Sequence, residues 1–237
     1  MNSSHSDNGE SKPSKKAEKS PTKASKTKET ILNVALKIAS HDGIDGLTIG
    51  ELAKAVGMSK SGLFAHFQGK DNLQLEVLKL ATDRFVDQVM RTAFREAKGE
   101  PRIQAFFNNW LTHLNDATAY SSGMLLIAAS LELDDQPGPL RDFLQQVQRD
   151  LIGNIEKAAR IAVEVGHFRH DLDVEQFAWS MYSYVLGYLH FKRMLEDPKV
   201  ERHVERAFNA LLSISRSATF RGTELNRNSD LGIKTNN

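Results

Sequence analysis

The chain has 237 residues, 40% of them hydrophobic, which is enough apolar surface for one large domain or two small ones. The lack of Cys excludes disulfides and thiolate metal sites, and it permits a reducing compartment. The N-terminus has no apolar signal-peptide core, and no later run approaches the ~18 apolar residues of a membrane span. We therefore expect a cytoplasmic protein with no membrane partner.

The net charge of +1 conceals a basic N-terminal segment. Residues 1–28 carry seven lysines against Asp7, Glu10 and Glu18, so the rest of the chain is slightly acidic. A segment rich in Ser, Lys and Pro without apolar periodicity cannot offset its ordering entropy, and we expect residues 1–26 to be disordered. This tail could reach a polyanion, or it could be a solubilising leader that binds nothing specific. The sequence leaves both interpretations open.

The first helical pattern begins at Thr27. Apolar residues recur at helical spacing from Ile31 to Ala39 and form one face. Gly43 then suits a left-handed C-terminal cap. These features predict an amphipathic helix that buries one side.

Two shorter helices follow. Thr48, with a glutamate three residues later, forms a capping box, and Gly57 ends this helix after barely two turns. Ser59 can cap the next helix, over residues 60–67. Two short helices joined by a tight glycine-containing turn are typical of a helix-turn-helix, so we expect residues 27–72 to form a DNA-binding domain.

The second helix of such a motif enters the major groove by its N-terminal end. Small side chains permit close approach there, a lysine supplies charge, and exposed helix N–H groups favour phosphate. Phe64 and His66 could contact DNA or be structural, whereas the positions of Lys60 and Lys70 favour phosphate contact over ordinary solvated charge. Phe67 is expected in the core. The predicted DNA-contact residues are Thr48, Ser59, Lys60, Ser61, Gly62, Phe64, His66 and Lys70.

Only helical patterns are visible from residue 73 to residue 216. A long amphipathic helix begins at Lys70, and two apolar segments of helical length follow. The pattern from Leu140 to Val165 has a close 3.6-residue period and stops at Gly166. The fold class is therefore predicted to be all-α, with a three-helix DNA-binding domain followed by a helical C-terminal domain.

Two further helices are expected at residues 173–191 and 198–212. The first of them is apolar nearly all round, so it requires burial on two sides. Together they could cover the domain core and still pair with a second subunit as a four-helix bundle. We therefore assign ligand binding and dimerisation to residues 73–216, and we expect residues 217–237 to be a loose tail.

The segment ILNVALKIASHDGIDGLTIGELAKAVGMSKSGLFAHFQGKDNLQLEVL, residues 31–78, resembles the tetracycline-repressor (TetR) family of bacterial transcription regulators. The stretches LELDDQPGPLRDFL and GHFRHDLDVEQFAWSMYSYVLGY resemble ligand-binding domains of one branch of that family. The resemblance implies an all-helical homodimer that binds a palindromic operator, usually as a repressor, and releases it when a small molecule enters the C-terminal domain. The family commonly has Tyr where this chain has Phe64, so only the packing of the ring is expected here.

Large amphipathic residues of the C-terminal helices are candidates for an effector pocket, although aromatic and Met residues at helical spacing are also typical of plain core. An apolar or aromatic effector suits them better than a multiply charged one, because the sequence shows no basic cluster. The candidates are Trp110, His113, Met124, Trp179, Met181 and Tyr184.

The sequence favours no catalytic role. It contains no H-E-x-x-H metal motif, no phosphate-cradling glycine loop and no G-x-S-x-G elbow, so we expect no catalytic residue, metal or cofactor. Two other functions stay open. The protein could be a DNA-binding dimer that senses no effector, or an activator, since the sign of regulation depends on where the operator lies.

Overall fold

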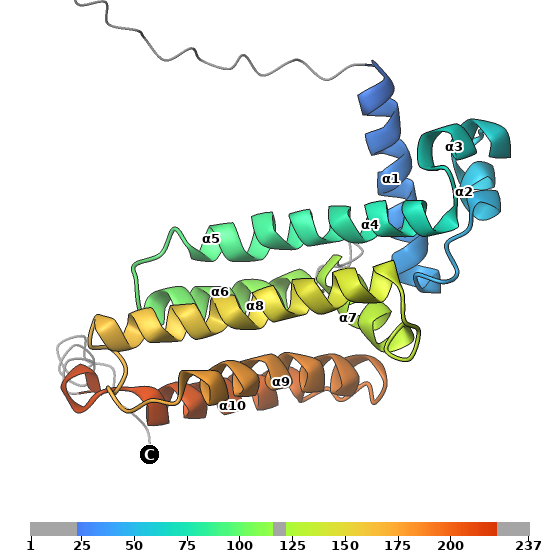
Figure 1. Ribbon diagram of the computed structural model, residues 1–237. Helices are drawn as coiled ribbons and strands as arrows, with labels where there is room; N and C mark the ends of the chain where they lie inside the picture. Colours follow the sequence, from blue (N-terminus) through green and yellow to red (C-terminus); the bar gives the residue numbers. More distant parts are fainter. Residues whose placement is uncertain (1–22, 116–121, 222–237) are drawn as a thin grey trace, which may run out of the picture.

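The computed structural model describes residues 23–115 and 122–221, which are helical apart from connecting segments and one isolated bridge between Phe168 and Arg216. The prediction of an all-α protein is confirmed. Residues 1–22 of the expected basic tail and residues 222–237 of the expected C-terminal tail lie outside the described residues. Figure 1 shows a small helical head at one end of a longer helical body.

The head is built from the three helices that the sequence predicts before residue 70. They are α1 (Lys23–Asp42), α2 (Ile49–Val56) and α3 (Lys60–Phe67). Leu36, Leu52 and Leu63 come from the three helices in turn and are at most 1% exposed, so they form the core of the head. The first helix begins at Lys23 rather than at the predicted Thr27, which removes four residues from the expected tail.

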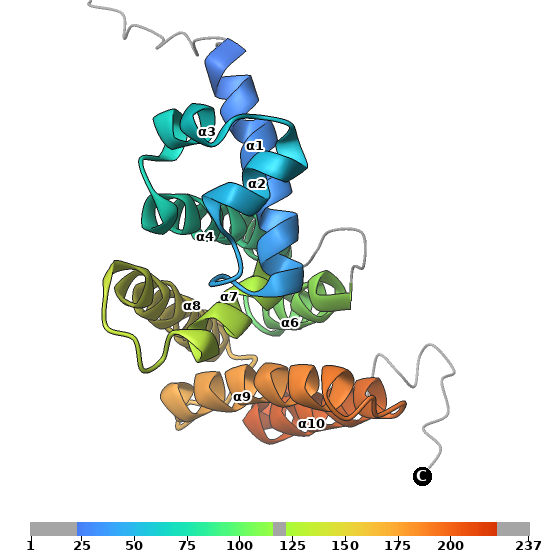
Figure 2. The same ribbon diagram turned by 90° about the vertical axis from the view of Figure 1, so that its right-hand side faces the viewer.

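The body contains the remaining helices. They are α4 (Lys70–Phe85), the π-helix η1 (Val86–Met90), α5 (Arg91–Ala93), α6 (Glu100–Asn115), α7 (Ser122–Glu132), α8 (Pro139–Glu164), α9 (Val174–Arg193) and α10 (Val200–Ser215). Helix α4 packs on α1, α7 and α8, and α9 packs between α8 and α10. Figure 2 shows α9 and α10 side by side at the end of the molecule opposite the head.

Helix α4 links the head to the body. Its first turn contains the predicted domain boundary at residue 72, so one continuous helix serves both parts. The sequence predicts an α-helix that continues to Val89, but the backbone changes to π-helical geometry from Val86 to Met90. Such π-bulges are often found at functional sites, and both of these end residues line a cavity described below.

Order extends beyond the predicted start of the C-terminal tail. The backbone N–H of Ser217 donates to the carbonyl of His167 at 2.9 Å, and the Ser217 hydroxyl donates to the carbonyl of Gly166 at 2.6 Å. The ring of Phe220 stacks on His167 with the ring centroids 4.3 Å apart. Residues 217–221, which were expected to belong to the loose tail, are therefore held against the body.

A buried ion pair closes the same end of the body. Glu100, the first residue of α6, is only 3% exposed and accepts hydrogen bonds from Nε and Nη2 of Arg216. Within the described ranges no helix is both long and apolar enough to cross a bilayer. No group of three or more metal-ligating side chains that could hold a metal ion is found in those ranges either.

Candidate DNA-binding surface and effector cavity

Hydroxyl caps begin both helices of the helix-turn-helix. Thr48 Oγ1 accepts the N–H of Glu51 at 3.1 Å, and Ser59 Oγ accepts the N–H of Gly62 at the same distance, as predicted. Gly57 takes the left-handed conformation with φ of 66°, which provides the tight turn between them. Ser59 Oγ also shares a hydrogen bond with Ser61 Oγ at 3.1 Å, whereas capping uses only an acceptor lone pair of Thr48 and leaves its O–H able to donate.

Helix α3 has one buried and one exposed face. Leu63 and Phe67 point into the core of the head, which confirms the expected place of Phe67. Lys60 and Ser61 are exposed, and the ring of Phe64 is 55% exposed. An exposed phenylalanine on this face adds nothing to the core, so the face is available to a partner.

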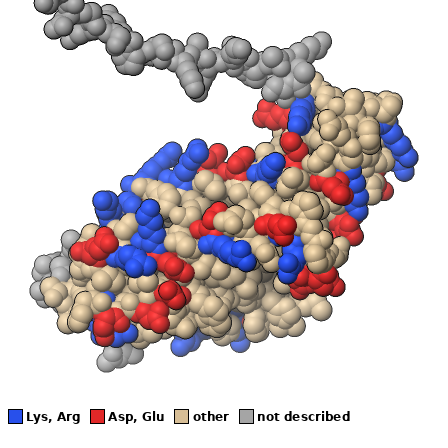
Figure 3. All heavy atoms as spheres, in the orientation of Figure 1, with Lys and Arg blue, Asp and Glu red and all other residues tan. Residues whose placement is uncertain are grey.

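The other predicted DNA contacts occupy different surroundings. A Cβ added at Gly50 of α2 would lie 3.5 Å from Lys60 Nζ, so this lysine leans over the beginning of α2. His66 is half-buried, with its ring 6.2 Å from that of Phe67. Lys70 Nζ lies 2.7 Å from Asp45 Oδ1, so its charge is already paired. Figure 3 shows Lys and Arg side chains at the outer edge of the head.

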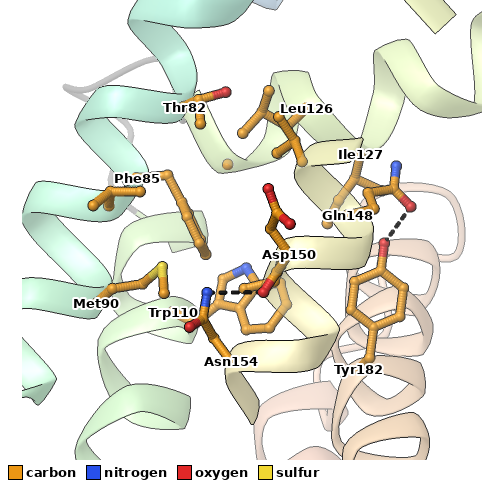
Figure 4. Close-up of a pocket in the computed structure, with 14 residues that line it drawn as sticks. Thr82, Phe85, Met90, Trp110, Leu126, Ile127, Gln148, Asp150, Asn154 and Tyr182 are labelled. Carbon is orange, nitrogen blue, oxygen red and sulfur yellow. Dashed lines mark hydrogen bonds between the residues drawn. The ribbon is translucent and has the colours of Figure 1, made fainter. Parts of the chain in front are cut away.

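A cavity of about 310 Å³ lies in the body and is enclosed by α4, η1, α6, α7, α8 and α9 (Figure 4). Most of its wall is apolar, and a few polar groups lie on α8 and α9. The lining residues are Thr82, Phe85, Val86, Met90, Trp110, Gly123, Leu126, Ile127, Val147, Gln148, Asp150, Leu151, Asn154 and Tyr182. Its size and composition are typical of a small-molecule site.

Polar groups in this wall can orient a ligand. Tyr182 donates its hydroxyl to Gln148 Oε1 at 2.9 Å, and burial raises the pKa of that hydroxyl, so it remains a donor. The indole of Trp110 lies between Phe85 and Tyr182, at centroid distances of 5.4 and 6.0 Å. Its Nε1 is buried and has no hydrogen-bond partner among the described residues. Asp150 also lines the cavity (Figure 4), but it is exposed to solvent, and its Oδ1 accepts a hydrogen bond from Nε2 of Gln146 at 2.8 Å.

Of the six predicted pocket residues, Trp110 lines this cavity and His113 supports its wall. His113 Nε2 accepts the N–H of Gly123 at 3.2 Å, and its ring packs edge-on against Phe85. Phe85, which also lines the cavity, is not among the predicted pocket residues, although it lies in the long amphipathic helix expected from Lys70. That amphipathic pattern was the available signal, and it does not distinguish core from cavity.

The remaining four candidates lie elsewhere. Met181 is fully buried, Trp179 is 65% exposed, Met124 is half-buried outside the lining, and Tyr184 lines a separate groove between α9 and α10. Because α9 turns Tyr182 toward the cavity, its neighbours along the chain face other directions. The structure therefore does not bring the six candidates into one site.

One helix touches both the cavity and the head. Gly123, Leu126 and Ile127 of α7 line the cavity, and Glu132 at its end accepts the backbone N–H groups of Ile44 and Asp45 at 3.0 and 2.9 Å. These two N–H groups belong to the loop between α1 and α2. Sequence reasoning missed Glu132, because its partners lie nearly ninety positions away in the chain.

The same loop is held from α4 as well. Gln74 is buried and donates from Nε2 to the carbonyl of Ile44 at 2.5 Å. Gly43 has φ of 83°, and an added Cβ would lie 3.1 Å from the Glu132 carboxylate. A glycine is therefore required here both for the backbone conformation and for the close approach.

Two family models match the chain. The model described as bacterial regulatory proteins, tetR family, matches residues 31–77, and the model described as tetracyclin repressor-like, C-terminal domain, matches residues 99–208. The HTH-type transcriptional regulator AcrR of Shigella flexneri is 26% identical over 176 residues, which cover 72% of this chain and 80% of AcrR.

Solved structures share the fold. A TetR-family transcriptional regulator from Cytophaga hutchinsonii superimposes with a TM-score of 0.72 at 18% identity, covering 84% of this chain and 98% of that one. AibR, in complex with isovaleryl coenzyme A and operator DNA, superimposes with a TM-score of 0.61 at 21% identity, covering 79% of this chain and 97% of AibR. The two family models match both halves of the chain in order and together cover well over half of it, so the chain belongs to the TetR family of DNA-binding transcriptional regulators, which are typically ligand-responsive repressors.

Proposed function

We propose that this regulator binds a palindromic operator as a homodimer and releases it when a small molecule occupies the cavity between α4 and α8. The observation that carries the proposal is the double contact of α7, whose side chains line the cavity while Glu132 holds the α1–α2 loop of the head. A helix with both contacts gives a ligand a direct mechanical route to the DNA-binding helices.

The exposed face of α3 supports the DNA-binding part of the proposal. Lys60, Ser61 and Phe64 are exposed, and Lys60 and Ser61 lie in the first turn of α3, the end that would enter the groove. Lys70 would contact phosphate after leaving Asp45, since a phosphate offers the ammonium group an equivalent anionic partner. In a two-fold dimer the two α3 helices would lie roughly 34–36 Å apart, one turn of DNA.

Exposed apolar residues on α9 and α10 support dimerisation. Trp179 is 65% exposed, Phe191 48% and Ile214 66%, and all three lie on the two helices farthest from the head. Large apolar side chains in water are unfavourable, and a second copy would bury them by completing a four-helix bundle. The same helices keep their other faces in the core through residues such as Phe177 and Phe208.

Helices α4 and α7 both line the cavity and both reach the head, which supports the effector response. Thr82, Phe85 and Val86 belong to the helical path that begins at Lys70 beside the head. A ligand that favours a different position of α4 or α7 would change the separation of the two heads, and operator affinity would fall by the ligand's differential affinity for the two states. AibR, which shares this fold, is known in complex with both isovaleryl coenzyme A and operator DNA.

Fluorescence anisotropy of the full chain tests this function, using DNA fragments that flank its own gene, nonspecific competitor DNA and a salt series. We expect competitor-resistant binding to a palindromic fragment, followed by its loss when an effector from a metabolite screen is added. Weak, steeply salt-dependent binding to every fragment would contradict specific regulation. Specific binding that no cavity ligand weakens would favour a DNA-binding dimer without effector sensing.

A further inference from the structure

A second cavity of about 300 Å³ lies next to the first one along α8. Asn154 lines both cavities. On α8 the first cavity is lined from Val147 to Asn154, and the second from Asn154 to Ile161. The lining residues of α8 recur every three or four positions, and some have a direct neighbour in the chain that also lines the cavity. These positions share one face of the helix, so the two cavities lie end to end over roughly 20 Å of α8, with Asn154 at their junction.

The two cavities differ in charge. The first cavity is mainly apolar and contains the carboxylate of Asp150, whereas the second cavity contains Arg102 and Lys157 and no carboxylate. Neither of these two cations has an ion-pair partner among the described residues. Figure 3 shows several Lys and Arg side chains, with Asp and Glu side chains among them, over the part of the surface that α5 and α8 share.

Arg102 is held in place but incompletely bonded. Its Nη2 donates to the carbonyl of Glu96 at 2.9 Å, and its guanidinium lies 5.6 Å from the centre of the Phe94 ring. Its Nε is buried and has no hydrogen-bond partner in the described part of the chain. A buried cationic donor without an acceptor is costly, and an anionic ligand group in the second cavity would supply the acceptor.

We propose that the two cavities bind one amphipathic anion, with an apolar chain or ring system in the first cavity and a carboxylate or phosphate group beside Arg102 and Lys157. Asp150 sets the orientation, because its negative charge repels an anionic group from the first cavity. The regulatory consequence rests on the proposed function, whereas the binding itself does not. The basic pair escaped sequence analysis because Arg102 and Lys157 lie on different helices, far apart in the chain.

Tryptophan fluorescence gives a local test, since the chain has only two tryptophans. Trp179→Phe removes the exposed one and leaves Trp110, in the cavity wall, as the only reporter. The full chain with this substitution is titrated with decanoate, decyl phosphate, decan-1-ol and decyltrimethylammonium, below their micelle concentrations and at constant ionic strength. We expect at least one of the two anions to bind about tenfold more tightly than the alcohol. Comparison of the two anions distinguishes a carboxylate from a phosphate ligand.

Variants assign the preference to the proposed site. Arg102→Met and Lys157→Met should each remove most of the difference between the anion and decan-1-ol. Lys157 is exposed, so its replacement leaves the core unchanged even if Arg102→Met reduces folding. Arg95→Met is the matched control, because Arg95 is exposed in the same region and lines neither cavity. It should retain the full preference.

Three results would overturn the proposal: equal or tighter binding of the alcohol or the trimethylammonium compound, an anion preference that survives both methionine substitutions, or no change in Trp110 emission with any probe. Operator binding, measured by anisotropy in the same samples, separates this proposal from the proposed function. Selective anion binding without operator release would support the site and contradict the regulatory role. Operator release by all four compounds alike would support the regulatory role and contradict the anion site.

Discussion

The carboxylate of Glu132 accepts the backbone N–H of Ile44 at 3.0 Å, so the last residue of α7 holds the loop that joins the first two helices of the head. Ile44 is fully buried, and its N–H has little access to water. The second carboxylate oxygen accepts the N–H of Asp45 at 2.9 Å. The head is thus positioned on the body by a pair of charge-assisted hydrogen bonds as well as by the continuity of α4.

Replacing Glu132 should weaken this connection. We expect Glu132→Ala to lower the free energy of unfolding by about 1–3 kcal/mol, because the N–H of Ile44 loses its acceptor. Urea unfolding measures this change, and operator affinity should fall with it because the head becomes less constrained. Glu132→Gln keeps one acceptor oxygen, so its free energy of unfolding should lie between those of the unchanged protein and Glu132→Ala. Asp134→Asn, at an exposed carboxylate nearby, is the control; an equal loss in both would exclude a specific role for Glu132.

Lys70 provides a test of phosphate contact. Lys70→Ala should weaken binding almost equally for all DNA sequences and flatten the dependence of log affinity on log salt by about one unit. Asp45→Asn should have the opposite effect on affinity, because it removes the carboxylate that competes with phosphate for Lys70. Lys79→Ala, at an exposed lysine farther along α4, is the control. A change in base preference for Lys70→Ala would contradict the phosphate role.

Ser61 tests the position of α3 in the groove. Ser59 Oγ accepts the N–H of Gly62, so Ser61 is not needed for this cap, and a glutamate in the first turn is favourable for the helix. Ser61→Glu should therefore fold normally by circular dichroism and lose operator binding through repulsion by the DNA. Ser61→Gln has nearly the same size without the charge and should retain more affinity. Full affinity in the glutamate variant would place another surface in the groove.

Gly99 tests the packing at the far end of the body. It has φ of 96°, and an added Cβ would lie 2.3 Å from His167 Nδ1, which accepts the N–H of Glu100. We expect Gly99→Ala to lower the free energy of unfolding by about 1–3 kcal/mol through strain and the displaced histidine. Gly153→Ala is the matched control, since a Cβ there meets nothing within 4 Å. It should be stabilising by about 0.5–1 kcal/mol. Equal changes in the free energy of unfolding for Gly99→Ala and Gly153→Ala would contradict the predicted clash with His167.

Ile214 tests the dimer face. Ile214→Asp places a charge in the apolar surface of α10, and we expect sedimentation to show a monomer whose operator affinity is much reduced, because only one half-site is bound. Asn209→Asp adds the same charge at another exposed position of α10 and should remain dimeric if it lies outside the interface. A dimer that persists in the Ile214 variant would exclude this part of α10 from the interface.

Local patterns in the sequence were sufficient for the helices of the head. Capping by Thr48 and Ser59, the turn at Gly57 and the buried positions of Leu63 and Phe67 all depend on residues within a few positions of one another. Such interactions are determined by chain geometry at short range. Apolar spacing with a 3.6-residue period likewise predicts the helices of the body, including α8 with its stop near Gly166.

The cavity residues required the tertiary structure. Trp110 and Trp179 are equal candidates by sequence pattern, yet Trp110 lies in the cavity wall and Trp179 is exposed to solvent. Periodicity shows that a helical face is apolar but does not show whether core, cavity or a second subunit covers it. The π-helical segment from Val86 to Met90 is also absent from any sequence pattern, because an α-helical spacing was expected there.

The sequence by itself therefore determined the all-α fold, the helix-turn-helix and the family, since these follow from short-range spacing and motif order. Only the tertiary structure decided which distant residues meet. Glu132 reaches Ile44, and Arg102 shares a cavity with Lys157, through the packing of helices that are remote in the chain. The physical reason is that side-chain periodicity specifies the buried face of each helix, whereas the neighbour on that face depends on how all the helices pack together.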